Sequence, residues 1–198
     1  VLGGGVVGSN AARMAAGLGA EVVVLERSIP RMRELDDLYQ GRILTRYSTF
    51  AAVEDEILKA DVVIGAVLTA GAAAPKLVRR EHLKQMKPGS VLVDVSIDQG
   101  GCFETSKPTT HAQPTYVVDG VVHYCVANMP GAAPRTSSEA LGNATLPFGL
   151  ALADKGLDAL KANVHLARGL NVLKGELTHP AVAEALGKTS IDPYGAWK

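Results

Sequence analysis

Short apolar, β-branched runs alternate with stretches of helical periodicity from Val1 to about Val126. The runs, each expected to be a strand, are Glu21–Leu25, Arg42–Tyr47, Asp61–Val67, Val91–Ile97, Thr115–Val118 and Val121–Val126. Apolar residues recur at helical spacing in Ser9–Leu18, Ile29–Leu38, Thr49–Lys59 and Lys76–Met86. This alternation predicts an α/β fold with a doubly wound parallel sheet and right-handed crossovers. Runs that are apolar throughout, such as Val62–Ile64, suit strands covered on both faces.

The pattern changes near residue 130, where prolines bracket a glycine- and alanine-rich loop. The sequence Thr136-Ser137-Ser138-Glu139 then predicts a capping box that opens a helix reaching Ala153 or Lys155, with Pro147 kinking or dividing it. Shorter helices are expected at Leu157–Asn163 and Pro180–Leu186. We therefore expect an α/β domain over 1–135 and a mainly helical C-terminal segment over 136–198. That segment has too few strands for a sheet, so we expect it to pack on another domain.

Only Val1 and Leu2 precede a glycine cluster, whereas a buried strand usually has about 5–6 residues. We interpret the first strand as truncated and the chain as part of a longer protein, whose preceding domain would receive the helical segment. A processed domain with a short first strand is the alternative.

Composition narrows the function classes. Lys and Arg number 20 and Asp and Glu 20 among 198 residues, so the formal net charge is zero and gives no reason to expect nucleic acid or a membrane surface as partner. No apolar run approaches the roughly 20 residues of a membrane helix. Cys102 and Cys125 lack metal-ligand spacing, so neither a disulfide scaffold nor a metal site is expected. Free thiols and the absence of a signal peptide suit the cytoplasm.

The run Gly3-Gly4-Gly5-Val6-Val7-Gly8 matches the dinucleotide fingerprint G-x-G-x-x-G between a strand end and the helix Ser9–Leu18. In a Rossmann-type sheet, Gly3 permits the tight turn, Gly5 lets the main chain approach a pyrophosphate, and Gly8 allows the helix to pack closely. The start of the helix then offers unpaired N–H groups and its positive dipole to the phosphates.

Glu26 ends the second expected strand, where a carboxylate can accept both ribose hydroxyls of adenosine. It would repel a 2′-phosphate, so we expect NAD rather than NADP. Arg27, Arg31 and Arg33 lie nearby and offer an alternative phosphate site, although they also suit a solvated helix face.

Polar residues follow other strands at the sheet edge where ligands bind in such folds. Asp98, after Val93–Ile97 and before Gly100-Gly101, is either a functional acid acting on substrate or water or a structural one, whereas Asp94 inside the strand suits structural hydrogen bonds. Asn128 can bond a carboxamide or ribose and Met129 can pack beside a ring, but from the residues alone a turn-forming Asn and a space-filling Met are the preferred interpretation. Further candidate walls of an adenine and ribose pocket are Ser48, Val67 and Leu68.

The histidines show no partner at catalytic spacing. His82 lies on an expected basic helix and is predicted to be solvated, and His111 lies in a loop. No Gly-x-Ser-x-Gly elbow or Walker loop occurs, so nucleophilic catalysis and phosphoryl transfer are not expected.

Five segments together resemble bacterial alanine dehydrogenases: Gly3–Gly8, Arg46-Tyr47-Ser48, Val93–Glu104, Pro108-Thr109-Thr110 and Tyr124–Pro130. The Asp-Gln-Gly-Gly run at 98–101 is more specific than the glycine loop, because the related transhydrogenase subunit differs there. The resemblance covers the whole chain but only the second part of such an enzyme. It implies NAD-dependent, reversible oxidative deamination of L-alanine to pyruvate and ammonia, and a homo-oligomer, in this family a hexamer.

The resemblance also implies roles for residues. Asp98 matches the catalytic aspartate, Glu26 the ribose-binding acid, and Arg31 a basic residue near adenosine. The remaining matches line the cofactor: Val6 and Val7 on the pyrophosphate loop, Ser48, Val67, Leu68, Val95, Ser96, Ile97, Val126, Ala127, Asn128 and Met129. The chain departs from the family in having Glu26 for Asp and Lys107 for a common arginine.

The catalytic histidine and the arginine and lysine that hold the substrate carboxylate belong to an N-terminal domain in this family, so we expect the chain alone to be inactive or nearly so. The alternatives are the NAD-binding subunit of a proton-translocating transhydrogenase and a non-catalytic NAD-binding module.

Overall fold

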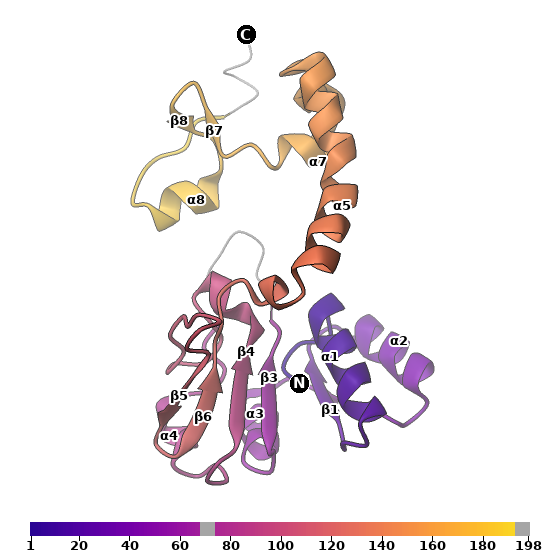
Figure 1. Ribbon diagram of the computed structural model, residues 1–198, viewed down its shortest axis with the longest axis vertical. Helices are drawn as coiled ribbons and strands as arrows, with labels where there is room; N and C mark the ends of the chain where they lie inside the picture. The colour runs from indigo at the N-terminus through magenta and orange to yellow at the C-terminus, as the bar shows by residue number, and fades with distance from the viewer. Residues whose placement is uncertain (68–73, 193–198) are drawn as a thin grey trace. The chain divides into compact units, whose positions relative to one another are not determined.

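The computed structural model describes residues 1–67 and 74–192, and it divides the chain into two compact units, Val1–Met129 and Pro130–Lys198. Figure 1 shows a sheet with helices in the first unit, and helices with a small hairpin in the second. Every residue that the sequence analysis proposes for a site belongs to the first unit, so this unit is described first.

The described strands of the first unit form parallel pairs with one antiparallel exception. Strands β1 and β2 are parallel, as are β3 with β4 and β4 with β6, whereas β5 runs antiparallel to β6. Their bounds are Val23–Glu26 for β1, Leu44–Tyr47 for β2, Val62–Gly65 for β3, Val91–Asp94 for β4, Thr115–Val118 for β5 and Val121–Tyr124 for β6. Each expected strand is therefore present, although most are shorter than the apolar run that predicted them.

Leu2 joins the two groups of strands. It forms parallel bridges to Leu25 and to Gly65, and its N–H donates to the carbonyl of Ile64 at 2.8 Å. The strand order is therefore β2-β1-Leu2-β3-β4-β6-β5. From Leu2, the chain first adds β1 and β2 on one side and then adds β3, β4 and β6 on the other, so the strand order reverses beside Leu2. Doubly wound sheets bind ligands at such a switch point.

Helices cover both faces of this sheet. Val24 packs in a cluster with Ala12 of α1 (Val6–Gly17) and Leu35 of α2 (Ile29–Tyr39). The next residue, Leu25, packs in a second cluster with residues of α3 (Phe50–Ile57) and α4 (Arg80–Leu83). Successive residues of a strand point to opposite faces, so the two clusters lie on opposite sides of the sheet. The doubly wound α/β fold is thus confirmed.

The helix expected at Lys76–Met86 is present only as the short α4, Arg80–Leu83. The preceding residues run extended instead, with the N–H of Leu77 donating to the carbonyl of Cys102 at 2.8 Å and a parallel bridge between Val78 and Phe103. Residues 74–78, named the strap below, are therefore held by a loop about 25 residues further along the chain. Hydrophobic spacing alone could not reveal that pairing.

The second unit is mainly helical. Its described helices and strands are α5 (Pro134–Lys155), α6 (Asp158–Ala162), α7 (Val164–Ala167), β7 (Val172–Leu173), β8 (Glu176–Leu177) and α8 (Pro180–Ala185). Helix α5 begins at Pro134 rather than at the expected capping box, because proline suits the first turn, and no side chain caps this end. Pro147 lies inside α5 without dividing it.

Candidate functional site

The glycine loop between Leu2 and α1 needs glycine for two different reasons. Gly3 has a φ of +97°, and a Cβ there would lie 2.7 Å from the carbonyl oxygen of Ala66. A Cβ on Gly8 would lie 1.8 Å from the carbonyl oxygen of Gly3, so α1 packs directly on the loop. A Cβ on Gly5 would meet nothing within 4 Å. Gly3 and Gly8 are therefore required by packing, whereas Gly5 faces open space beside the sheet's switch point.

The start of α1 is open as well. Gly5 is its N-cap and no side chain caps it. Within residues 1–67 and 74–192, the N–H groups of Val6, Val7 and Gly8 have no hydrogen-bond acceptor. Val6 is 80% exposed and Val7 is 47% exposed. The positive end of a helix of 12 residues is thus available to an anionic group.

Glu26, at the end of β1, is bound to the glycine loop. Its Oε2 accepts the N–H of Gly4 at 2.7 Å, and its Oε1 accepts the N–H groups of Arg27 and Ser28 at 2.7 and 2.8 Å. Partial burial acts to raise the pKa of this carboxyl, but the backbone donors and the nearby Arg31 outweigh it and hold the pKa below its usual value. Glu26 is therefore a stable carboxylate beside the loop.

Arg31 holds the other polar group of Gly4. Its Nε donates to the Gly4 carbonyl at 2.7 Å, and its Nη1 donates to Glu34 at 2.8 Å. The carboxylate of Glu26 thus holds the N–H group of Gly4, and the guanidinium of Arg31 holds its carbonyl group. Arg31 is committed to internal partners, which argues against its use as a free receptor for a 2′-phosphate.

The other residues expected near adenosine lie at the same sheet edge. The N–H of Ser48, just after β2, donates to the Glu26 carbonyl at 2.9 Å. Val67 follows β3 by two residues, and its carbonyl accepts the hydroxyl of Ser96 at 2.7 Å. Leu68 lies outside the described residues. The structure thus brings Ser48 to Glu26 and Val67 to the turn after β4.

Asp98 lies in a 3₁₀ turn, Val95–Gln99, directly after β4. Its neighbours Ser96 and Ile97 are buried, but Asp98 is exposed, and no hydrogen bond or ion pair to its carboxylate occurs within the described residues. A carboxylate that no internal group uses, placed at the carboxyl edge of the sheet, is free to act on a ligand.

Asp94, the last residue of β4, is fully buried and has the structural role expected of it. Its Oδ1 accepts the N–H of Ser96 at 3.1 Å, before Asp98 in the chain. Its Oδ2 accepts the N–H of Cys102 at 2.9 Å, as well as the hydroxyl of Ser106, after Asp98. One buried carboxylate thus ties together the two ends of the loop that carries Asp98.

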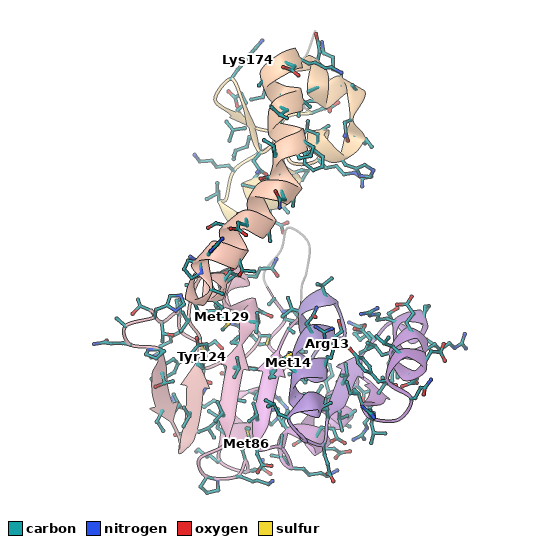
Figure 2. All side chains as sticks on the ribbon, turned by 45° about the vertical axis from the view of Figure 1, so that its right-hand side comes forward. Arg13, Met14, Met86, Tyr124, Met129 and Lys174 are labelled. Carbon is teal, nitrogen blue, oxygen red and sulfur yellow. The ribbon has the colours of Figure 1, made fainter. Side chains whose placement is uncertain are left out.

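The segment after β6 completes this edge. Val126 is fully buried, Asn128 has a left-handed φ of +56°, and Met129 is the last residue of the first unit. Figure 2 shows Met129 and Met86 at opposite ends of the sheet. Met86 precedes β4, so Met129 marks the carboxyl edge.

His111 makes a contact with Asn128 that the sequence analysis did not predict. Its Nε2 lies 3.0 Å from the carbonyl oxygen of Asn128, and Thr109 is bonded to both Cys125 and Ala127 through the backbone. The loop around His111 therefore supports the backbone of Asn128. No sequence signal pointed to this contact, because the two residues lie 17 positions apart and share no pattern.

Three further titratable side chains of this unit are buried: Cys102, His123 and His82. Burial, reinforced by Asp94, raises the pKa of the Cys102 thiol far above its usual value, so the thiol stays protonated. Burial also lowers the pKa of His123, whose ring stacks on Tyr116 with centroids 4.9 Å apart. His82 was expected to be solvated, but it is buried, and its Nδ1 accepts the N–H of Arg79 at 3.1 Å.

Residues 1–67 and 74–192 contain no cluster of His, Cys, Asp or Glu that could bind a metal ion. Across these same ranges, no helix has the length and apolar character needed to span a membrane.

Comparisons with known proteins agree with this geometry. The model of the family described as alanine dehydrogenase/PNT, C-terminal domain, matches residues 1–180. The chain is 70% identical to an alanine dehydrogenase of Halomonas elongata over 97% of its own length and 52% of the relative's. It thus spans about half the length of the curated relatives it matches.

Two solved structures are similar over most of the chain. An L-alanine dehydrogenase superimposes with a TM-score of 0.84 at 51% identity, covering 94% of this chain and 52% of the other. A transhydrogenase from Sinorhizobium meliloti superimposes with a TM-score of 0.70 at 28% identity, covering 91% of this chain and 48% of the other.

Proposed function

Because the chain belongs to the alanine dehydrogenase/PNT C-terminal domain family, we propose that it supplies the NAD half-site and the catalytic aspartate of an L-alanine dehydrogenase. The reaction is the reversible conversion of L-alanine, NAD⁺ and water to pyruvate, ammonium, NADH and a proton. The observation that carries the proposal is the 70% identity to the Halomonas elongata enzyme, which extends over 97% of the chain and so spans both the glycine loop and Asp98.

The glycine loop fits a dinucleotide. The open space at Gly5 and the unpaired N–H groups at the start of α1 suit a pyrophosphate. Glu26 stays ionised, so its carboxylate can accept a ribose hydroxyl and repel a 2′-phosphate, which supports NAD over NADP. We assign Gly3, Gly5, Val6, Val7, Gly8, Glu26, Arg31 and Ser48 to this part of the site.

The turn after β4 and the segment after β6 form the reacting end in this proposal. The chemistry that NAD supplies when bound is acceptance of the hydride from the α-carbon of alanine. The exposed carboxylate of Asp98 accepts a hydrogen bond from the reacting amino group or from the water that replaces it. We assign Val67, Leu68, Val95, Ser96, Ile97, Val126, Ala127, Asn128 and Met129 to the walls of this end.

The reaction needs groups beyond those at this site. A base must take up a proton as hydride leaves, and cations must orient the substrate carboxylate. We propose that these groups lie outside this chain, which spans about half of its relatives' length, and that the chain alone binds cofactor without turnover. Helix α5 has no buried residue, and Leu141, Leu146 and Phe148 on it are exposed. This supports our proposal that segment 136–198 packs on another domain, with residues 1–135 as the NAD-binding domain.

The oligomeric state and location are further proposals. Both cysteines are free and buried, which suits a reducing compartment such as the cytoplasm. Membership of the family supports a homo-oligomer, with a hexamer as the expected form.

A transhydrogenase subunit is the second candidate, supported by the fold and by the family description. We place it second because the sequence identity to the transhydrogenase of known structure is 28%, whereas that to the alanine dehydrogenase of known structure is 51%. A non-catalytic NAD-binding module is the third.

The test has two steps. Calorimetry first measures NADH and NADPH binding to this chain, and NADH is expected to bind more tightly. The full-length product of the reading frame that encodes the chain is then assayed for alanine-dependent NADH formation. Binding of NADH without oxidation of alanine by the full-length protein would refute the enzyme assignment, and absence of any binding would refute the site as well.

A further inference from the structure

The strap, residues 74–78, bonds to consecutive carbonyls of the turn that carries Asp98. The N–H of Ala74 donates to the carbonyl of Gln99 at 3.0 Å, and the N–H of Leu77 donates to that of Cys102 at 2.8 Å. Between these two bonds, the Nζ of Lys76 donates to the carbonyls of Gly100 and Gly101. Every carbonyl from 99 to 102 therefore accepts a hydrogen bond from the strap.

A side chain is needed for the two middle bonds. Gly100 and Gly101 both have left-handed φ values, +83° and +75°, and their carbonyls converge on one ammonium at 2.5 and 2.8 Å. Pro75 has no N–H group to offer them. An ammonium with several donors can bond both carbonyls at once, and a charged donor makes stronger hydrogen bonds than a neutral one.

The opposite side of the turn is held by Asp94. Its carboxylate accepts the N–H groups of Cys102 and Phe103, so the N–H groups point inward while the carbonyls point to the strap. Asp98 lies between these restraints, exposed and without an internal partner in the described residues. The position of its carboxylate therefore depends on the backbone of the turn.

We propose that Lys76 is a positioning residue for Asp98: by bonding the carbonyls of Gly100 and Gly101, it fixes the turn in the form that presents the carboxylate of Asp98 to substrate. The proposal rests on the proposed function for its kinetic consequence, but not for its structural one. A displaced carboxylate slows the reacting step while leaving cofactor binding intact, since misplacement of a reacting group by about 1 Å can cost about 100-fold in rate.

The kinetic test uses the full-length protein and three substitutions. Lys76→Met removes the donors, Lys76→Arg retains charged donors, and Lys84→Met is the control, because Lys84 is an exposed lysine at the end of α4 away from the turn. We expect Lys76→Met to lower kcat at least tenfold with NADH affinity within twofold. We expect Lys76→Arg to recover most of kcat and Lys84→Met to match the wild type.

A double-mutant cycle separates positioning from a general structural role. In an Asp98→Asn background, Lys76→Met is expected to change the residual rate less than twofold, because the group that Lys76 positions is already disabled. An equal loss in both backgrounds, or wild-type kcat in Lys76→Met, overturns the proposal.

A second measurement on this chain does not depend on activity. The N–H of Gly100 donates to Ile97 and that of Gly101 to Ser96, so amide hydrogen exchange at these positions reports opening of the turn. We expect Lys76→Met to speed their exchange at least tenfold and Lys84→Met to leave it unchanged. Unchanged exchange in Lys76→Met overturns the proposal even if the wild type does not oxidise alanine, whereas faster exchange in an enzyme inactive toward alanine refutes only the proposed function.

Discussion

The carboxylate of Glu26 accepts the backbone N–H of Gly4 at 2.7 Å, so the acid that ends β1 also holds the glycine loop. The same carboxylate accepts N–H groups from Arg27 and Ser28, while Arg31 holds the carbonyl of Gly4. The geometry of the loop therefore depends on the Glu26 side chain, and we propose that the choice of coenzyme depends on it as well.

Glu26→Gln is expected to weaken the preference for NADH over NADPH by about tenfold, equivalent to about 1.4 kcal/mol. The substitution keeps the size of the side chain but removes its negative charge, which is what disfavours a 2′-phosphate. Binding of both coenzymes is measured by calorimetry. Glu21→Gln, an exposed glutamate before β1, is the control. An unchanged preference would show that Glu26 does not select the coenzyme.

Two glycine substitutions are expected to have opposite consequences. Gly8→Ala should lower the free energy of unfolding by about 3 kcal/mol, because the new methyl group meets the Gly3 carbonyl. Gly5→Ala should change stability by less than about 0.5 kcal/mol, since its methyl group enters open space, but should weaken NADH binding about tenfold. Denaturant unfolding of both variants measures the change in stability, and NADH titration measures the change in affinity. Equal NADH affinity in Gly5→Ala and wild type would exclude a pyrophosphate at Gly5.

Asp98→Asn in the full-length protein is expected to reduce kcat by about 100-fold or more, the typical contribution of a positioned proton-transfer group. Stability and NADH affinity should stay close to wild type, because Asp98 is exposed and its carboxylate makes no bond within the described residues. Steady-state kinetics and NADH titration are compared with those of Asp37→Asn, an exposed aspartate on α2. A wild-type kcat in Asp98→Asn would remove Asp98 from the mechanism.

His123 is expected to make the fold less stable in acid. Burial lowers the pKa of the His123 imidazole in the folded state. At pH 7.5 this imidazole is therefore neutral in both the folded and the unfolded state. As the pH falls below the ordinary value of 6.5, the unfolded state takes up the proton first, and stability falls by at most about 1.4 kcal/mol per pH unit until the folded pKa is passed. Urea unfolding at pH 7.5 and pH 5 should show a smaller loss for His123→Gln than for wild type. Identical losses would contradict this assignment.

The sheet could be predicted from sequence because its strands are local runs of apolar residues. In Val62–Gly65 and Val91–Asp94, alternate residues are buried and the residues between them are partly buried or exposed. Both strands begin with three consecutive apolar residues, which give a clear apolar signal. The residue at which each strand ends was harder to predict, because polar residues at the sheet edge follow the apolar runs directly and the spacing of apolar residues does not mark the boundary. Glu26 and Asp98 could be proposed as site residues since each ends or follows such a run.

Contacts between distant segments could not be predicted in this way. The extended strap forms because Leu77 and Val78 pair with Cys102 and Phe103, and the same apolar residues would also suit a helix. His82 carries helical spacing and basic neighbours in sequence, yet the short α4 turns its ring inward to accept the Arg79 N–H. The bond between His111 and Asn128 likewise joins residues that share no sequence pattern.

The carboxylate of Asp94 ties Ser96 to Cys102 and Ser106 across the intervening loop. A single anchor that holds both ends of a loop fixes the number of residues between them, because an insertion or deletion would carry some of the donors out of reach. Homologous proteins are therefore expected to tolerate changes of residue type between these anchor points, but to share the same loop length.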